Sequence, residues 1–248
     1  MTIEIIPLER LLIMLIPMAL VIYLMRSWGL NYLKACYAIF RMLLQLMLIG
    51  YALIMIFESE SSLMTLAVLC IMVLASSWIS LNTLSSLDSN LLQHKLKLFL
   101  IAISAVTLGG GFMLLIVTQV VLTIEPWFLP RYMIPLAGMI FATAMTSISL
   151  AGERVQSELM QGKSYENASK VAFNTSMIPN INAMFAVGLV SLPGMMTGQI
   201  LSGVSPFIAA RYQIMVMCML FAAAGISAFI FLNFAKKQLL LVIDRVDG

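Results

Sequence analysis

The sequence predicts an all-α fold, a polytopic membrane helix bundle of about seven transmembrane helices. Hydrophobic residues make up 62% of the 248 residues and charged residues only 10%, whereas a soluble domain carries about 25% charged residues. Seven apolar stretches are long enough to cross a bilayer, because a spanning helix needs roughly 20 mostly apolar residues. We therefore expect a single transmembrane domain over residues 1–248.

The predicted spans are separated by short connections and one longer one. They cover residues 8–25, 36–57, 62–81, 98–122, 132–150, 183–204 and 212–234. The first run carries Glu4 and Glu9 at its start and has no small-residue cleavage site. It is therefore expected to be a first span and not a removable signal peptide.

The basic residues predict which side of the membrane each connection faces, because cytoplasmic loops carry an excess of Lys and Arg. Ten of them fall in the first, third and fifth connections and the C-terminal tail, and three fall on the opposite side. We expect the N-terminus outside and the C-terminus inside.

Composition argues against several kinds of site. Cys36, Cys70 and Cys218 lie singly inside apolar runs, without the spacing of a zinc site or a disulfide framework. The 21 methionines are scattered along every span, which favours a packing role over Cu(I) binding. His94, the only histidine, is expected in an exposed loop and makes no metal site by itself. The net charge of +3, without a basic block, gives no support for nucleic-acid binding.

The second span carries Arg41 and Gln45, four residues apart on one helix face. Arg41 is close to the cytoplasmic end, where an arginine can snorkel to the lipid headgroups. Charges inside a membrane also mark transport pathways. Both interpretations stay open.

The sixth span is expected to be broken. Residues 187–198 read Val-Gly-Leu-Val-Ser-Leu-Pro-Gly-Met-Met-Thr-Gly. Pro193 lacks an amide hydrogen and clashes with the preceding turn, so a helix through residues 191–194 would kink. Freed backbone groups at membrane depth are tolerated against neighbouring protein or a water-filled cavity. The pattern predicts either a kinked packing helix or part of a pathway.

Small residues recur every four positions in two spans, and such stripes let helices approach closely in lipid. They predict helix packing, or a dimer face, at Gly138, Ala142 and Thr146 and at Gly194, Gly198 and Ser202. Three consecutive glycines at 109–111 have no phosphate-binding context and predict a close helix approach or a local bend.

The longest cytoplasmic connection, residues 151–182, predicts an elbow of two helices. Residues 153–161 can form a helix that Gly162 ends, because glycine is favoured just past a helix terminus. Ser164 can cap a second helix, which Pro179 would end. Ala168 and Val171 belong to a mildly apolar face of that helix.

Such an elbow can dock into a groove on a partner protein. The alternative is a helix lying on the membrane surface, but the second helix has only one basic residue, Lys170, and surface helices usually have a basic polar face.

The sequence Gly-Lys-Ser at 162–164 is not a phosphate-binding P-loop. That motif needs a glycine five residues before its second glycine, and position 157 is a serine. We expect no cofactor on this chain and no ATPase activity of its own. If ATP drives the protein, a separate subunit must bind the ATP and Mg²⁺.

Several of these segments resemble the permease subunits of the iron-export (Fet-type) ABC transporter family, which is related to plant aluminium-tolerance ABC permeases. The resemblance lies in residues 187–198, followed by Tyr-Gln-Ile-Met-Val at 212–216, Arg-Met-Leu-Leu-Gln at 41–45, Gly-Tyr at 50–51, and Ile-Pro-Leu-Ala-Gly-Met-Ile at 134–140. Glu158 and Gly162 match the loop by which many ABC permeases engage their ATPase. The likeness covers the second to the seventh span.

The resemblance implies a permease homodimer in a bacterial cytoplasmic (inner) membrane. It also implies two separate ATPase subunits on the cytoplasmic face and export of a metal ion such as iron. It implies that the elbow couples to the ATPase, through Glu158, Gly162, Ser164, Ala168 and Val171. It also implies a translocation path at or beside Arg41, Gln45, Ser191, Pro193, Gly194, Met195 and Met196.

The substrate stays open. Where the family usually has Gly-Asn, this chain has Ala142 and Thr143. No acidic residue lies within the apolar core of any predicted span, so a hard dication would need backbone carbonyls, hydroxyls or thioethers as ligands. A non-metal solute or a lipid-like substrate is the alternative, and the metal ligands are unknown.

Two other classes of protein fit less well. An intramembrane enzyme would need a nucleophile with a nearby base, or a metal cluster, and the spans offer neither. A secondary carrier would show inverted repeats, and the sequence contains no internal repeat.

Overall fold

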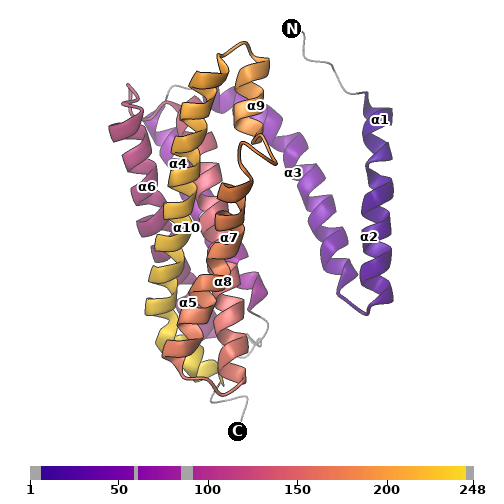
Figure 1. Ribbon diagram of the computed structural model, residues 1–248, viewed down its shortest axis with the longest axis vertical. Helices are drawn as coiled ribbons and strands as arrows, with labels where there is room; N and C mark the ends of the chain where they lie inside the picture. The colour runs from indigo at the N-terminus through magenta and orange to yellow at the C-terminus, as the bar shows by residue number, and fades with distance from the viewer. Residues whose placement is uncertain (1–6, 59–60, 85–91, 244–248) are drawn as a thin grey trace. The chain divides into compact units, whose positions relative to one another are not determined.

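The computed structural model describes residues 7–58, 61–84 and 92–243. In these residues the regular structure is helical, apart from one isolated β-bridge between Val187 and Ser191. The chain divides into two compact units, residues 1–59 and 60–248; both are drawn in Figure 1. The predicted all-α, polytopic helical fold is confirmed.

The first unit is built from apolar helices joined by short turns. α1 (Leu8–Ile13) and α2 (Leu15–Ser27) are separated by Met14, and α3 (Tyr32–Glu58) follows. The turn before α3 contains Gly29 at φ +69°, a left-handed conformation that glycine adopts without a Cβ clash. Across this turn the Arg26 guanidinium lies 5.6 Å from the centre of the Tyr32 ring.

The second unit contains the other helices. α4 (Ser62–Ser80) leads into the 3₁₀ turn η1 (Leu81–Thr83). A helical path then runs through α5 (Leu92–Ala105), the π-helix η2 (Val106–Gly111), α6 (Phe112–Leu115) and the π-helix η3 (Ile116–Val121). The unit ends with α7 (Pro130–Met160), α8 (Tyr165–Ala186), α9 (Gly194–Leu201) and α10 (Pro206–Ile243). Figure 1 shows α7 and α10 running the length of this bundle.

Six helices among the described residues are long and apolar enough to cross a membrane: Glu9–Ser27, Tyr32–Glu58, Ser62–Ser80, His94–Val121, Pro130–Met160 and Pro206–Leu241. They correspond to the first five predicted spans and the seventh. The predicted sixth span is not a single helix, because residues 183–204 contain the end of α8, a non-helical segment and α9. Together α8 and α9 carry the chain back along the bundle before α10 begins (Figure 1).

Two helix boundaries predicted for the elbow are wrong. The helix expected over residues 153–161 is the last part of α7, whose 31 residues span about 46 Å at 1.5 Å per residue. That length exceeds the roughly 30 Å of the hydrocarbon core, so one helix serves both as span and as elbow.

Pro179 does not end α8, which continues to Ala186. Ser176 and Met177, just before the proline, are buried. Met177 lies beside Gly225 of α10, where an added Cβ would be 3.5 Å from the Met177 Cε atom. Packing against α10 therefore keeps α8 helical at Pro179, although the proline cannot donate the backbone hydrogen bond.

Small residues allow close packing at the centre of the second unit. An added Cβ at Gly109 would lie 2.3 Å from the Ser227 Oγ atom of α10, and one at Gly110 would lie 3.0 Å from the Phe141 ring of α7. Both glycines belong to η2, and both are buried. The close helix approach predicted for residues 109–111 is confirmed.

His94 lies on α5 and not in an exposed loop, so that expectation is wrong. Its Nδ1 atom is 2.9 Å from the Gln238 Oε1 atom of α10, 144 residues away in the chain. The sequence does not predict this contact, because the two helices that it joins are far apart in the chain.

Candidate functional site

The turn between α7 and α8 has a regular glycine cap. Gly162 has φ +79°, its N–H donates to the Leu159 carbonyl at 2.9 Å, and the Lys163 N–H donates to the Glu158 carbonyl at 3.3 Å. These two bonds form a Schellman motif. An added Cβ at Gly162 would meet nothing within 4 Å, so the backbone conformation and not the available space requires glycine.

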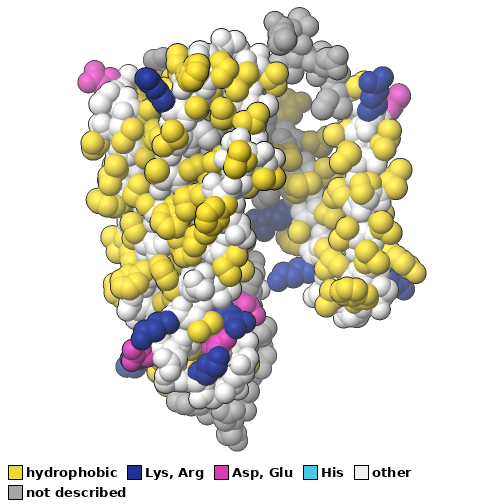
Figure 2. Space-filling view, viewed as in Figure 1, with side chains coloured by type: hydrophobic (Ala, Val, Ile, Leu, Met, Phe, Trp, Pro, Cys, Tyr) yellow, Lys and Arg dark blue, Asp and Glu magenta, His cyan; other side chains and the backbone are white. Residues whose placement is uncertain are grey.

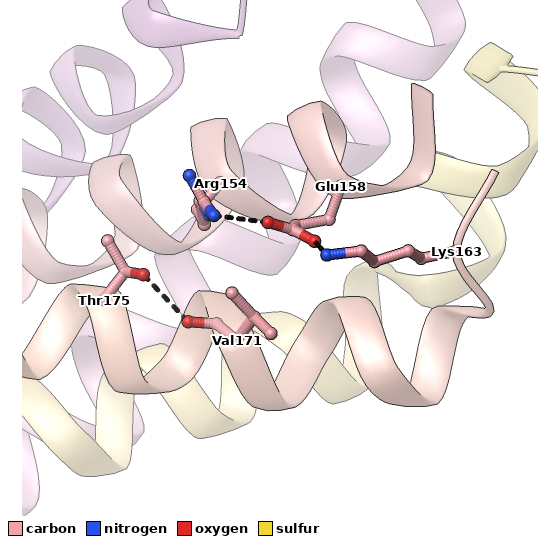
Figure 3. A network of polar contacts seen from close by, with 5 residues as sticks. All are labelled: Arg154, Glu158, Lys163, Val171 and Thr175. Carbon is pink, nitrogen blue, oxygen red and sulfur yellow. Dashed lines mark hydrogen bonds and ion pairs between the residues drawn. The ribbon is translucent and has the colours of Figure 1, made fainter. Parts of the chain in front are cut away.

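Glu158 ties this turn to the body of α7 (Figure 3). Its carboxylate forms ion pairs with Arg154, one helical turn earlier, and with Lys163, just beyond the turn. The Glu158 side chain is 1% exposed, whereas the side chains of Arg154 and Lys163 are 40% and 46% exposed. Because a buried carboxylate needs a partner, the two cations hold Glu158 in place and shield it from water.

The start of α8 is attached to α10. The Tyr165 hydroxyl donates to the Leu232 carbonyl, and the Lys236 ammonium lies 5.5 Å from the centre of the Tyr165 ring. Burial raises the pKa of the Tyr165 hydroxyl. Ser164 stands at the predicted capping position, but its side chain makes no capping hydrogen bond.

The apolar face predicted for the second elbow helix packs inward. Ala168 is fully buried and Val171 is half-buried. Thr175 also belongs to that face, and its hydroxyl donates to the Val171 carbonyl at 2.9 Å (Figure 3). A partner protein can therefore contact this helix only through its exposed residues.

Most exposed residues around the turn between α7 and α8 are polar or charged, with Met160 as an apolar exception. The other exposed residues there are Gln161, Gly162, Lys163, Ser164, Glu166, Asn167 and Lys170. Glu166 and Lys170 form an ion pair at 2.7 Å, and Lys170 holds the pKa of Glu166 below its ordinary value. Figure 2 shows charged side chains gathered at this end of the second unit and mainly hydrophobic ones over the helices above it. The turn between α7 and α8 therefore has a mainly polar and charged surface.

The segment between α8 and α9 is a true helix break and not only a kink. Gly188 has φ +84°, and its N–H donates to the Ser191 carbonyl at 3.0 Å. The Val190 and Ser191 N–H groups both donate to the Ala186 carbonyl, at 2.8 and 3.1 Å. Leu189 and Val190 are 92% and 84% exposed. Local backbone bonds hold this break, because its side chains pack against little else.

α9, beyond the break, lines a cavity of about 590 Å³ together with α7 and α10. That volume is within the roughly 300–1,000 Å³ of small-molecule sites. The lining includes Arg131 and Met139 from α7, Met195 and Gln199 from α9, and Tyr212 and Met215 from α10. α9, which lines this cavity, lies at the opposite end of the second unit from the turn between α7 and α8 (Figure 1).

The structure gathers only some of the residues predicted for a translocation path. Met195 lines the cavity; Pro193 and Met196 are half-buried nearby in sequence, while Ser191 and Gly194 are exposed. Arg41 and Gln45 lie on α3 in the first unit. The role of all these residues in transport stays a prediction.

Sequence reasoning missed Arg131, Met139, Gln199 and Met215 as neighbours of Met195. Gln199 could have been noticed in the sequence, because residues 183–204 contain no other Asn or Gln. The others could not, since their meeting depends on how α7 and α10 pack.

The small-residue stripes lie mostly on the surface. The exposed members are Ala142, Thr146, Gly194, Gly198 and Ser202. Gly138 is the exception, because an added Cβ there would be 3.5 Å from Met72 of α4. A dimer face at these stripes therefore stays a prediction.

The described residues contain no group of three or more His, Cys, Asp and Glu side chains that could hold a metal ion. This agrees with the scarcity of acidic residues in the predicted spans, and it leaves the identity of any metal ligands unknown.

Comparison with known proteins gives a family match over most of the chain. The uncharacterised protein family UPF0014 matches residues 8–240. The chain is 37% identical over 194 residues to UPF0014 membrane protein slr1647 of Synechocystis sp., with 71% of each chain covered.

Two further relatives have descriptive names. The chain is 33% identical over 205 residues to the probable iron export permease protein FetB of Escherichia coli, covering 77% of this chain and 75% of the relative. It is 31% identical over 207 residues to protein ALUMINUM SENSITIVE 3 of Arabidopsis thaliana, covering 77% and 72%. No solved structure matches the chain.

Proposed function

The chain belongs to the UPF0014 family of membrane proteins, and from this premise we propose that it is the permease subunit of an ATP-driven ABC transporter. It is an integral membrane protein, and the part of the chain that the structure describes contains six apolar helices that can span a bilayer. Its bacterial relatives support a place in the cytoplasmic (inner) membrane.

The construction of the elbow carries this proposal. α7 extends past the apolar span and reverses into α8 through a capped turn, with Glu158 buried between two cations. A push on the exposed tip would pass into α7, because the ion pairs and the Schellman bonds join the tip to that helix. An ATPase that changes shape on hydrolysis needs a contact of this kind on the membrane subunit.

The proposed assembly has two copies of this permease and two ATPase subunits. ATP and Mg²⁺ bind to the ATPase, and this chain carries no cofactor of its own. The exposed elbow residues, with Glu166 and Lys170 among them, form the docking surface. Glu158 and Ala168 support that surface from inside, since both are buried.

The name of FetB suggests a metal ion such as iron as one candidate substrate. The alternative is a non-metal solute or a lipid-like molecule. The second candidate has support from the chain itself, because the cavity beside α9 contains a positive charge and no acidic side chain among its lining residues.

The test is co-purification with a candidate ATPase that has a complete P-loop. Reversing the exposed ion pair, as Glu166→Lys with Lys170→Glu, keeps the charge total and the fold but inverts the docking surface. We expect the ATPase to be lost. Arg211→Glu, near the start of α10 and away from the elbow, is a surface control for a charge reversal elsewhere and should retain the ATPase. Unchanged ATPase recovery with the reversed pair would overturn the assignment of the docking surface.

A further inference from the structure

We infer that the cavity between α7, α9 and α10 binds an amphipathic organic anion: an apolar body with one anionic group and a hydrogen-bond donor. The inference deepens the proposed function, because such a molecule would be what the transporter moves. Binding itself needs no ATPase and can be measured on the permease alone.

The one charged residue of the lining, Arg131, is exposed and favours an anion. Arg131 is the only Lys, Arg, Asp or Glu among its lining residues, and Arg131 makes no ion pair with another described residue. A guanidinium pairs with carboxylate, phosphate or sulfonate through two parallel hydrogen bonds. A bare divalent cation would be repelled by Arg131 and would find none of the carboxylate ligands that hard cations need.

The walls of the cavity select an apolar body. Met139, Met195 and Met215 come from three different helices and are partly buried against the core of the second unit. Methionine side chains are flexible and polarisable, so they adapt to aliphatic chains and rings of varied shape. Three thioethers would also suit a soft metal ion, but the neighbouring guanidinium opposes that occupant.

Gln199 adds a requirement for a hydrogen-bond donor. Its Oε1 atom is buried and has no hydrogen-bond partner among the described residues. A buried acceptor without a partner costs free energy, and in most proteins such an atom is paired with protein or water. Because this atom has almost no accessible surface, the Gln199 side chain must turn toward the cavity before a hydroxyl or N–H group on the bound molecule can supply the missing bond. Gln199 can reach the cavity because the helix restarts at Gly194, after the break.

The experiment measures saturable binding to the full-length permease in phosphatidylcholine nanodiscs, with empty nanodiscs subtracted. The probes are radiolabelled decanoate, 3-hydroxydecanoate and the neutral analogue decanol. We expect decanoate to bind, 3-hydroxydecanoate to bind more tightly, and decanol to bind weakly. Arg131→Gln should weaken decanoate binding by about tenfold, the loss expected of one charge-assisted contact, and leave decanol unchanged.

Arg211→Gln is the matched charge control, because Arg211 lies near the start of the same helix as Tyr212 and does not line the cavity. It should bind all three probes as the unsubstituted chain does. Gln199→Met should remove only the advantage of the hydroxyl group. Met139→Trp should fill the cavity and abolish binding of every probe, with the thermal unfolding midpoint confirming that the protein is folded.

Native mass spectrometry distinguishes a membrane lipid from a soluble amphiphile as the bound anion. Phosphatidylglycerol retained by the unsubstituted chain and lost in Arg131→Gln would identify a lipid; decanoate binding without retained lipid would identify a soluble amphiphile. Equal decanoate binding by the Arg131→Gln and Arg211→Gln variants would overturn the inference. So would saturable Fe²⁺ binding that decanoate competes with and Met139→Trp abolishes. Loss of the ATPase in the co-purification assay would leave these results unaffected, so the two proposals fail separately.

Discussion

The turn at Gly162 and the break at Gly188 use the same backbone device in opposite settings. Each glycine has a positive φ, +79° and +84°, and an added Cβ at either would meet nothing within 4 Å. At the first, a carboxylate 1% exposed is clamped by two cations. At the second, the neighbouring Leu189 and Val190 are 92% and 84% exposed, and only local backbone bonds close the turn.

This difference indicates which role suits the turn at Gly162 and which suits the break at Gly188, the two places where the helical path is interrupted. A turn tied by two ion pairs to a buried carboxylate of α7 moves with that helix, so it can transmit a force. A turn held by its own backbone bonds can change shape without disturbing the core, because few buried contacts depend on it. The elbow is therefore the rigid interruption of this chain, and the segment before α9 is the adjustable one.

The largest expected effect comes from removing both cations at the elbow. Arg154→Met with Lys163→Met leaves the Glu158 carboxylate buried without a partner, which is strongly destabilising. We expect the thermal unfolding midpoint to fall by several degrees. Glu158→Gln should lower it less, because the cations that remain are 40% and 46% exposed and water can solvate them.

The control for this pair of variants replaces all three side chains. Adding Glu158→Leu to the double variant removes the orphaned charge, and well-packed apolar residues can substitute for a buried ion pair. Much of the lost stability should return. If Glu158→Gln proved more damaging than loss of both cations, the clamp would not act as described.

A medium effect is expected from valine at the two glycines. Gly162→Val and Gly188→Val should each cost about 1–2 kcal/mol in the free energy of unfolding, the cost of a left-handed conformation with a Cβ. Gly162→Asn and Gly188→Asn should cost less, because asparagine tolerates that conformation. The free energies of unfolding of all four variants and the unsubstituted chain, measured in one detergent, test this prediction.

Co-purification with the ATPase should distinguish the variants at Gly162 from those at Gly188. Gly162→Val should weaken it and Gly188→Val should not, although their effects on stability are similar. Equal loss of the ATPase in both variants would remove the distinction between a rigid and an adjustable interruption.

The smallest effect concerns pH. Lys170 lowers the pKa of Glu166, so their ion pair stabilises the folded state above the carboxyl's unfolded pKa. That contribution is lost as the pH falls through the lowered, folded-state pKa. Unfolding midpoints of the unsubstituted chain and Glu166→Gln should differ slightly at pH 7 and converge in acid. A gap that widens as the pH falls would contradict this assignment.

Local patterns in the sequence predicted much of the helical architecture. The apolar runs predicted the long helices of both units, Gly162 predicted the end of α7, and the glycines at 109–111 predicted a close approach. Each of these follows from hydropathy or from the backbone preference of one residue. The break around Pro193 was predicted in the same way. It is a non-helical segment over residues 187–193 and not a single kink.

Other features could not be predicted, because packing overrides local preference. Pro179 would end an isolated helix, yet Ser176 and Met177 are buried beside α10 and α8 continues. Ala168 has a spacing that suits a docking face, but that face turned toward the core. The stripe of Ala142 and Thr146 suits helix packing, but both residues are exposed.

The sequence by itself determined that this chain is a helical membrane protein with a glycine turn at Gly162 and a broken span. Hydropathy, charge and glycine act along the chain, so their effects are visible without neighbours. Only the tertiary structure decided that Glu158 is buried between Arg154 and Lys163, and that Arg131, Gln199 and three methionines surround one cavity. Burial and cavity lining depend on which helix faces which, and no local pattern specifies that.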